Sequence, residues 1–147
     1  MRHRVVKKTL GRDGDHRKSL LSNLYSELID KEKINTTLAK AKFLKPKIER
    51  LITKAIKAHK SEDKILKFNI VKSLKQDIRS EEVIRKLIDN IAPKFSNRKG
   101  GYTKIIKTGN RDGDNSLTAR IELVSSLEET KEKLKKKVTK KDENKSK

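Results

Sequence analysis

The fold is decided by residues 37–57, which read TLAKAKFLKPKIERLITKAIK. Apolar residues recur there at helical spacing, so the stretch predicts the longest helix of the chain, with an apolar stripe formed by Ala41, Leu44, Ile48, Leu51, Ile52 and Ala55. Pro46 lacks a backbone N–H, so we expect it to kink this helix or to begin a new first turn. A separate sector, about 100° wide, carries Lys40, Lys47, Arg50, Lys54 and Lys57. This sector can meet an anion, although lysines on an outer helical face are also ordinary solvated residues.

Segments on both sides of this helix complete the prediction of an α+β fold. Helical spacing also runs from about Asp15 to about Lys31, and Thr36 or Thr37 can cap the central helix after a short β-branched strand at residues 34–37. Two further helices follow the capping signals at residues 61–63 and 80–82, and we expect Pro93 to end the second. After Pro93, strand-like patterning at residues 102–107 and 119–124 flanks a long hairpin loop or crossover. The sequence thus predicts about four helices packed with a small sheet of two or three strands.

Charged segments flank this predicted domain. Residues 1–15 hold many cations and few apolar residues, so we expect an extended basic arm that binds a polyanion. Residues 125–147 are rich in Lys and Glu and have little to pack, so we expect a tail that is disordered away from its target. Residues 16–124 between them predict a single globular α+β domain.

The charge of the chain points to nucleic acid. The sequence holds 40 Lys and Arg against 20 Asp and Glu, a formal net charge of +20. Such a charge repels itself in a compact state, and binding phosphates relieves the repulsion and releases counterions. With only two Tyr and three Phe, a platform for stacking bases is poorly supplied, so recognition of shape and backbone is expected. Folded RNA is the favoured partner, while a DNA-compacting protein and a module that docks on an acidic protein are the alternatives.

The sequence offers no constellation for catalysis. It lacks Cys, its three His residues are isolated, and it has no phosphate-loop motif, nucleophile elbow or coupled Ser, His and Asp arrangement. We therefore expect no enzyme, no metal, no cofactor and no small-molecule substrate. No apolar run approaches the roughly 20 residues of a membrane span and no signal peptide is recognisable, so we expect a cytoplasmic protein without a membrane partner.

Two local segments are candidates for phosphate contact. Residues 94–104 combine cations and aromatics with the adjacent Gly100 and Gly101 and contain no acid, and paired glycines let backbone N–H groups approach phosphate. The alternative is that these glycines only turn the chain into a strand. In residues 2–18, seven cations oppose only Asp13 and Asp15, and the alternative there is a solvated charged terminus.

Familiar fragments recur in order along residues 1–124. They include Met1-Arg2-His3-Arg4, Leu20-Leu21-Ser22-Asn23-Leu24, Thr36-Thr37-Leu38-Ala39-Lys40-Ala41-Lys42, Ile91-Ala92-Pro93-Lys94-Phe95 and Arg98-Lys99-Gly100-Gly101-Tyr102-Thr103-Lys104-Ile105. Through these fragments the chain resembles the ribosomal protein L17 family of the bacterial large subunit. The resemblance implies a structural component of the large ribosomal subunit, with large-subunit ribosomal RNA and neighbouring ribosomal proteins as partners. It also implies a small mixed sheet and a place near the nascent-chain exit region.

The charge pattern and the resemblance together give one set of candidate RNA-binding residues. They are Arg2, His3, Arg4, Lys7, Lys8, Arg12, Arg17, Lys18, Lys40, Lys42, Arg98, Lys99, Gly100, Gly101, Tyr102 and Lys104. The sequence departs from the family's usual pattern at Asp13-Gly14-Asp15 and at Ser116-Leu117-Thr118. The Lys-rich tail lies beyond the matched region, so the resemblance implies no contacts for it.

Overall fold

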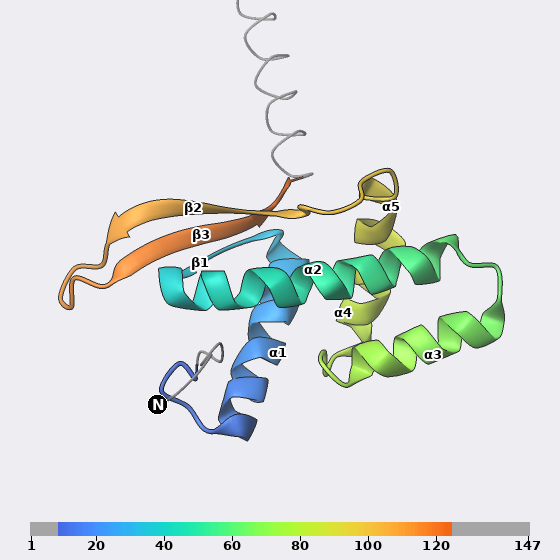
Figure 1. Cartoon of the computed structure of the whole chain (residues 1–147), viewed down its shortest axis with the longest axis horizontal. Coiled ribbons are helices and arrows are strands. Elements are labelled where there is room, and N and C mark those ends of the chain that lie inside the picture. Colours follow the sequence, from blue (N-terminus) through green and yellow to red (C-terminus); the bar gives the residue numbers. More distant parts are fainter. Residues whose placement is uncertain (1–8, 125–147) are drawn as a thin grey trace, which may run out of the picture.

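The computed structural model describes residues 9–124, so residues 1–8 of the predicted arm and all of the predicted tail lie outside the described residues. The elements follow the order α1 (Gly14–Lys31), β1 (Lys33–Thr37), α2 (Leu38–Lys60), α3 (Lys64–Lys75), α4 (Glu81–Lys86), η1 (Leu87–Ile91), α5 (Ala92–Lys94), β2 (Thr103–Asn110) and β3 (Leu117–Leu123). The π-helical turn η1 joins α4 and α5 into one continuous helical segment. This architecture confirms the predicted α+β class (Figure 1).

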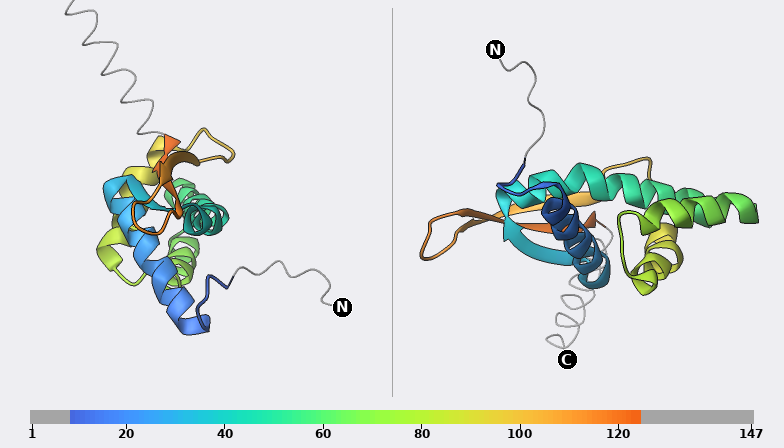
Figure 2. Two further views of the ribbon diagram at one scale, coloured as in Figure 1. Left: turned by 90° about the vertical axis from the view of Figure 1, so that its left-hand side faces the viewer. Right: turned by 90° about the horizontal axis from the view of Figure 1, so that it is seen from below.

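Helix α2 is the central element of the fold. In the view of Figure 1 it crosses the molecule with the sheet above it and α1 and α3 below it, and Figure 2 shows the same arrangement from two further directions. Every residue of its predicted apolar stripe is buried. The stripe shares one hydrophobic core with Leu28 of α1, Leu87 of η1 and Ile121 of β3. The stretch at residues 37–57 therefore organises the rest of the chain around it.

The sheet has three strands in the order β1-β3-β2. Both pairings are antiparallel, so the mixed sheet implied by the resemblance is replaced by an antiparallel one. Ile121 of β3 lies opposite Ile34 of β1 on one side and Ile105 of β2 on the other. Of the two predicted connections between β2 and β3, the structure has the hairpin, whose turn is closed by a hydrogen bond from the Arg111 N–H to the Ser116 carbonyl at 3.0 Å.

The two prolines lie within helical segments. Helix α2 is continuous through Pro46, so this residue does not begin a new helix. The fourth helix does not end before Pro93, because the backbone widens into η1 and continues into α5, with the Ala92 N–H donating to the Leu87 carbonyl. A proline cannot donate to the carbonyl four residues before it, and its ring clashes with that carbonyl. A π turn just before Pro93 is a local way to accommodate both effects.

The turn between α1 and β1 is made by Glu32 in the left-handed conformation, with φ of 58°. Its carbonyl accepts a hydrogen bond from the Leu123 N–H at 2.9 Å, and its carboxylate pairs with Lys94 Nζ at 3.0 Å. These contacts tie the end of α1 to β3 and to α5. They fix the end of the sheet at which β3 finishes and β2 begins, since Leu123 is opposite Thr103.

A candidate nucleic-acid interface

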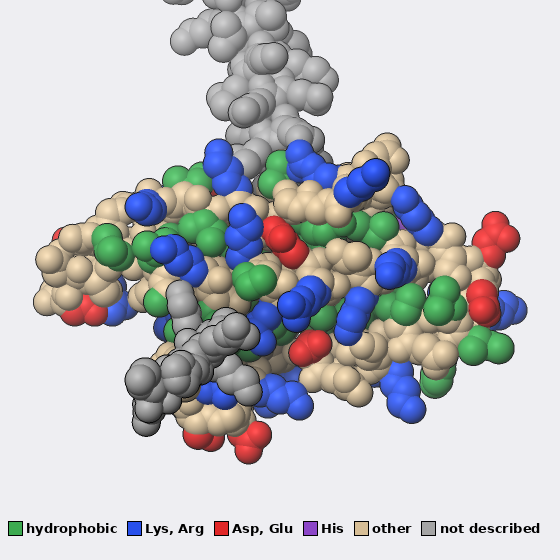
Figure 3. All heavy atoms as spheres, in the orientation of Figure 1, with side chains coloured by type: hydrophobic (Ala, Val, Ile, Leu, Met, Phe, Trp, Pro, Cys, Tyr) green, Lys and Arg blue, Asp and Glu red, His purple; other side chains and the backbone are tan. Residues whose placement is uncertain are grey.

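The outer face of α2 carries a dense set of cations. The helix contains seven Lys and one Arg against a single acid, Glu49. Of the predicted basic sector, Arg50 and Lys57 are exposed, and Lys40, Lys47 and Lys54 are half-buried. Figure 3 shows Lys and Arg side chains spread across the face over which α2 runs. The amphipathic pattern thus presents one apolar and one basic surface, as the sequence predicted.

The cations of this sector are not neutralised by carboxylates. Within residues 9–124, none of Lys40, Lys47, Arg50, Lys54 and Lys57 forms an ion pair with Asp or Glu. Lys54 Nζ instead donates to Ser73 Oγ at 2.7 Å, and Lys47 Nζ lies 5.0 Å from the ring centre of Phe43. By contrast, some lysines on other helices pair with acids, as Lys31 does with Glu27 and Lys86 with Asp30. The positive charge of the basic sector is therefore not cancelled by acids of the described residues and can attract an anion from solvent.

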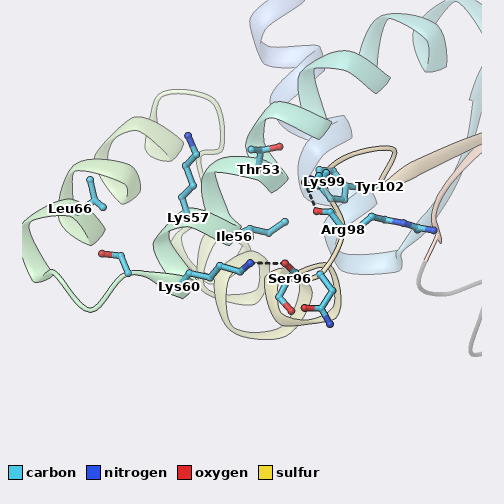
Figure 4. A pocket seen from close by; sticks show the side chains of 11 residues that line it. Thr53, Ile56, Lys57, Lys60, Leu66, Ser96, Arg98, Lys99 and Tyr102 are labelled. Carbon is cyan, nitrogen blue, oxygen red and sulfur yellow. Dashed lines mark hydrogen bonds between the residues drawn. The ribbon is translucent and has the colours of Figure 1, made fainter.

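The loop at residues 96–101 is held against the end of α2. Phe95 and Tyr102, at its two ends, pack edge to face with ring centres 5.3 Å apart. The Tyr102 hydroxyl donates to the Arg98 carbonyl at 3.3 Å, and Lys60 Nζ of α2 donates to the Ser96 carbonyl at 2.6 Å (Figure 4). These contacts hold the loop in a defined shape before any ligand binds.

A groove separates α2 from this loop. One part has a volume of about 760 Å³ and is lined by Ile56, Lys57, Lys60, Leu66 and Tyr102 among others. A second hollow of about 520 Å³ shares Thr53, Lys99 and Tyr102 with the first and adds Arg50, Lys54 and Gly100. It also includes one acid, Glu49, whose carboxylate accepts a hydrogen bond from the Thr103 hydroxyl at 2.9 Å. The groove therefore brings part of the basic sector of α2 together with the glycine loop, which lies about 40 residues later in the sequence. Its cations and exposed glycine backbone suit a phosphate chain.

The candidate residues of the glycine loop take different positions. Lys99, Gly100 and Gly101 are exposed. The side chain of Arg98 points away from Lys57 and Lys60 and toward the strands (Figure 4). Tyr102 is only 2% exposed and belongs to the core, so it can shape the loop but presents almost no surface of its own. Gly101 has φ of 66°, which is a conformation that glycine adopts without strain.

The remaining candidates lie away from the groove. Lys104 is exposed on β2, where it is opposite Glu122 of β3, and Lys42 is exposed near the start of α2. Lys40 lines a third hollow of about 430 Å³ with Asn35, Thr36, Thr37, Thr108, Arg111 and Thr118. The structure therefore brings only part of the candidate set into one place.

The candidates near the N-terminus form a separate group. Arg17 Nη1 donates to the Arg12 carbonyl, and Arg12 Nη1 donates to the Leu10 carbonyl, each at 3.1 Å. Lys18 is exposed on the first turns of α1. In Figure 1 this end of α1 lies far from α5 and the loop that follows it. Arg2, His3, Arg4, Lys7 and Lys8 lie outside the described residues.

Two cations that the sequence did not single out also belong to these surfaces. Lys60 bridges α2 and the glycine loop, and its position one turn after Lys57 was the only signal for it in the sequence. Arg111 lies in the hairpin turn, where its guanidinium contacts Asp114 through Nε at 2.9 Å and through Nη2. The Arg111 guanidinium, together with a hydrogen bond from the Ser116 N–H, holds the pKa of Asp114 well below its usual range. Arg111 is thus already engaged with an acid, unlike the basic sector of α2.

Other kinds of site find little support in this part of the chain. Among residues 9–124 there is no group of three or more His, Cys, Asp and Glu side chains that could hold a metal ion. No helix among the same residues is long and apolar enough to cross a membrane. The grooves along α2 are therefore the strongest candidate site in the described structure.

Comparison with known proteins agrees with the fragments noted in the sequence. A family model described as ribosomal protein L17 matches residues 20–124. The large ribosomal subunit protein bL17 of Fervidobacterium nodosum is 43% identical over 126 residues, which cover 84% of this chain and 99% of that protein. The proteins of the same name from Thermotoga maritima and Campylobacter lari are 38% and 45% identical, over 86% and 85% of this chain and over 96% and 100% of their own lengths.

Proposed function

The chain belongs to the ribosomal protein L17 family, and from this membership we propose that it binds and stabilises folded large-subunit ribosomal RNA through the phosphate backbone. It is a structural component of the large ribosomal subunit and not an enzyme, and its place in bacteria is the cytoplasm. Ribosomal RNA and neighbouring large-subunit proteins are accordingly its partners. The position near the nascent-chain exit region rests on the family resemblance alone.

The observation that carries this proposal is the groove between α2 and the glycine loop. Lys57, Lys60 and Lys99 lie around it, and Arg50 and Lys54 continue the basic surface along α2. Lysine acts on phosphate as a point charge with rotatable donors, so this surface suits a backbone of variable sequence rather than a particular base. Tyr102 and Phe95 support the loop from inside the core.

We propose that the remaining candidate residues contact RNA on further, separate surfaces. The cations at residues 2–18 lie on or before the start of α1 in the sequence, Lys40 lines the hollow beside the strands, Lys104 lies on β2, and Lys42 is exposed near the start of α2. We assign residues 1–15 to an RNA-binding arm, residues 16–124 to the globular domain and residues 125–147 to a tail. A body with contacts on separated surfaces can hold together RNA helices that converge from different directions.

Salt dependence tests the phosphate contacts. We expect the logarithm of the affinity for large-subunit ribosomal RNA to fall linearly with the logarithm of the salt concentration, with a slope of roughly 0.7–0.9 for each neutralised phosphate. Filter binding of the full chain between low and physiological salt measures the slope. A slope near zero would contradict backbone binding.

Nuclease treatment separates this function from its alternatives. We expect the chain to sediment with large particles from cell extracts and to lose this association after ribonuclease but not after deoxyribonuclease. Release by deoxyribonuclease alone would instead indicate a DNA-compacting protein. An association that resists both nucleases would indicate docking on a protein.

A further inference from the structure

Helix α3 carries an apolar surface that the fold leaves uncovered. Of the large apolar side chains in residues 9–124, four are exposed, and three of them lie on α3: Ile65 at 72%, Leu66 at 46% and Phe68 at 67%. Figure 3 shows apolar side chains gathered at the end of the molecule where α3 lies. Burying apolar surface lowers the free energy by roughly 25 cal/mol per Å², so a partner that covers these side chains would gain binding energy.

The pattern of α3 explains why one apolar surface remains after folding. At ~100° per residue, Ile70, Val71 and Leu74 lie on one side of the helix, and Ile65 and Phe68 lie near the opposite side. The first group is the one that packs, since Leu74 is fully buried and Ile70 and Val71 border the core. The helix therefore has two apolar faces, and the protein's own core uses one of them.

The charges within α3 are all positive, and the acids nearest its start, Glu62 and Asp63, precede its first turn, where the Asp63 carboxylate caps the helix by accepting from the Ile65 N–H at 2.9 Å. Helix α3 carries Lys64, Lys67, Lys72 and Lys75 and no acid. Lys75 pairs with Glu81 at 2.6 Å, but within the described residues neither Lys64 nor Lys72 forms an ion pair. Lys72 falls on the same side of the helix as Ile65 and Phe68. The surface thus offers apolar contacts beside unneutralised positive charge.

From this combination we propose that the outer face of α3 docks a protein segment that presents apolar side chains beside carboxylates. Carboxylates on the partner would complement Lys64 and Lys72 while its apolar groups cover Ile65 and Phe68. A second copy of the chain is disfavoured, because each copy carries a net charge of +20. The chain's own residues 125–147 are disfavoured as well, because they hold nine Lys against five acids. RNA phosphates would suit the lysines but would leave the aliphatic side chain of Ile65 without an apolar partner.

This surface is distinct from the groove proposed for RNA, because Leu66, which lines that groove, lies about 160° around the helix from Phe68. The inference depends on the proposed function only in that the partner is sought within the large subunit. The experiment therefore places a photoactivatable phenylalanine analogue, p-benzoylphenylalanine, at position 68 of the full chain, with the same analogue at position 117 as the matched control. Leu117 is also an exposed apolar residue, at 55%, but it lies on β3.

Purified large subunits that contain each probe are irradiated, digested with ribonuclease, and analysed by mass spectrometry. We expect the probe at position 68 to give a ribonuclease-resistant adduct with a peptide that contains both apolar and acidic residues. We expect Lys64→Glu together with Lys72→Glu to lower the yield of this adduct by about tenfold or more, because like charges would then face each other. Lys31→Glu together with Lys86→Glu, on other helices, should leave the yield unchanged.

Four results would overturn the inference. They are an adduct with RNA, an adduct with the chain itself, no adduct above the level of the position-117 control, and a yield that charge reversal on α3 does not change. If the chain carrying the probe sediments with large subunits in any of these cases, the ribosomal assignment stands and only the α3 docking surface fails.

Discussion

At the scale of single residues, Gly100 and Gly101 look alike in sequence but differ in conformation. Only Gly101 lies in the left-handed region, and a Cβ atom added to either residue would meet nothing within 4 Å. Crowding therefore cannot explain a difference between substitutions at the two positions. Any difference must come from the backbone.

We predict that Gly101→Ala lowers the free energy of unfolding by roughly 1–2 kcal/mol, because an L side chain in the left-handed region is strained. Gly100→Ala, the matched control, should change it little or raise it by up to about 1 kcal/mol through the unfolded chain. Urea denaturation of the two variants measures both values. Equal effects would mean that the loop backbone differs from the one described.

Tyr25 gives the protein a predictable response to alkaline pH. Burial, together with the nearby Asp77 carboxylate, raises the pKa of Tyr25 above its ordinary value of 10.0. The folded protein then holds the phenolic proton at a pH where the unfolded chain loses it. The stability that this proton contributes is complete below about pH 10 and is lost as the pH rises from there toward the folded pKa.

We predict that above pH 10 the free energy of unfolding of the natural chain falls more steeply than that of Tyr25→Phe. The difference in slope should approach about 1.4 kcal/mol per pH unit, which corresponds to one proton. Denaturant titrations of both proteins between pH 8 and about pH 11.5 measure it, and lysine titration is common to both. Parallel curves over that range would contradict the raised pKa.

At the scale of elements, the unbroken course of α2 through Pro46 implies a missing hydrogen bond. An ordinary residue at position 46 would donate its N–H to the Lys42 carbonyl, and proline cannot. Pro46 is exposed and lines the smaller part of the groove, so replacing it removes no core packing. The helix therefore carries a local weakness in the middle of its basic surface.

We predict that Pro46→Ala raises the free energy of unfolding by about 1–3 kcal/mol, from the restored bond and the better helix propensity, less a smaller gain in unfolded-chain entropy. Thr53→Ala, at another exposed position of α2, should change it by about 0.5 kcal/mol or less. Chemical denaturation followed by circular dichroism gives both values. A loss of stability in Pro46→Ala would show that the proline ring makes contacts that α2 needs.

The helices and strands are the part of the fold that the sequence predicts best. Apolar periodicity predicted α1, α2 and the two main strands because burial of one face imposes that period on the sequence. It could not foresee that the backbone widens before Pro93, since several responses to a proline are possible. It also could not distinguish a hairpin from a crossover after residue 110, because both place the same residues on the same face.

The candidate site shows the same limit more strongly. The basic sector of α2 and the glycine loop were each visible in the sequence, but their union in one groove depends on how α5 returns the chain to α2. Tyr102 is an example: it belongs to the motif that predicted RNA contact, but its side chain is buried in the core. The motif alone does not show which of its residues are exposed. The composition predicts the chemical class of the ligand, here a polyanion. Only the tertiary structure shows which residues come together to form its binding site.

At the scale of the whole molecule, the position of a cation should matter more than the total charge. We predict that replacing Arg50, Lys54 and Lys57 with Ala reduces the salt slope of RNA binding by about 2–3, because up to three phosphate contacts disappear. Stability should change little, since exposed or half-exposed cations contribute little to it.

The matched control replaces Lys31, Lys75 and Lys86, three lysines that pair with Glu27, Glu81 and Asp30 on other helices. It removes the same number of positive charges, and we expect the salt slope to stay close to that of the natural chain. Binding isotherms across a series of salt concentrations measure both variants. Equal losses would show that RNA responds to net charge and not to the surface along α2.

The order β1-β3-β2 has a consequence for how the protein is made. The central strand is the last of the three to leave the ribosome that synthesises it, so β1 waits unpaired while almost the entire folded region is translated. A message interrupted before codon 117 would therefore yield a product whose sheet cannot close, with an open strand and a half-covered α2. Such a product would expose unpaired strands and would be a substrate for proteases, not a weaker version of the protein.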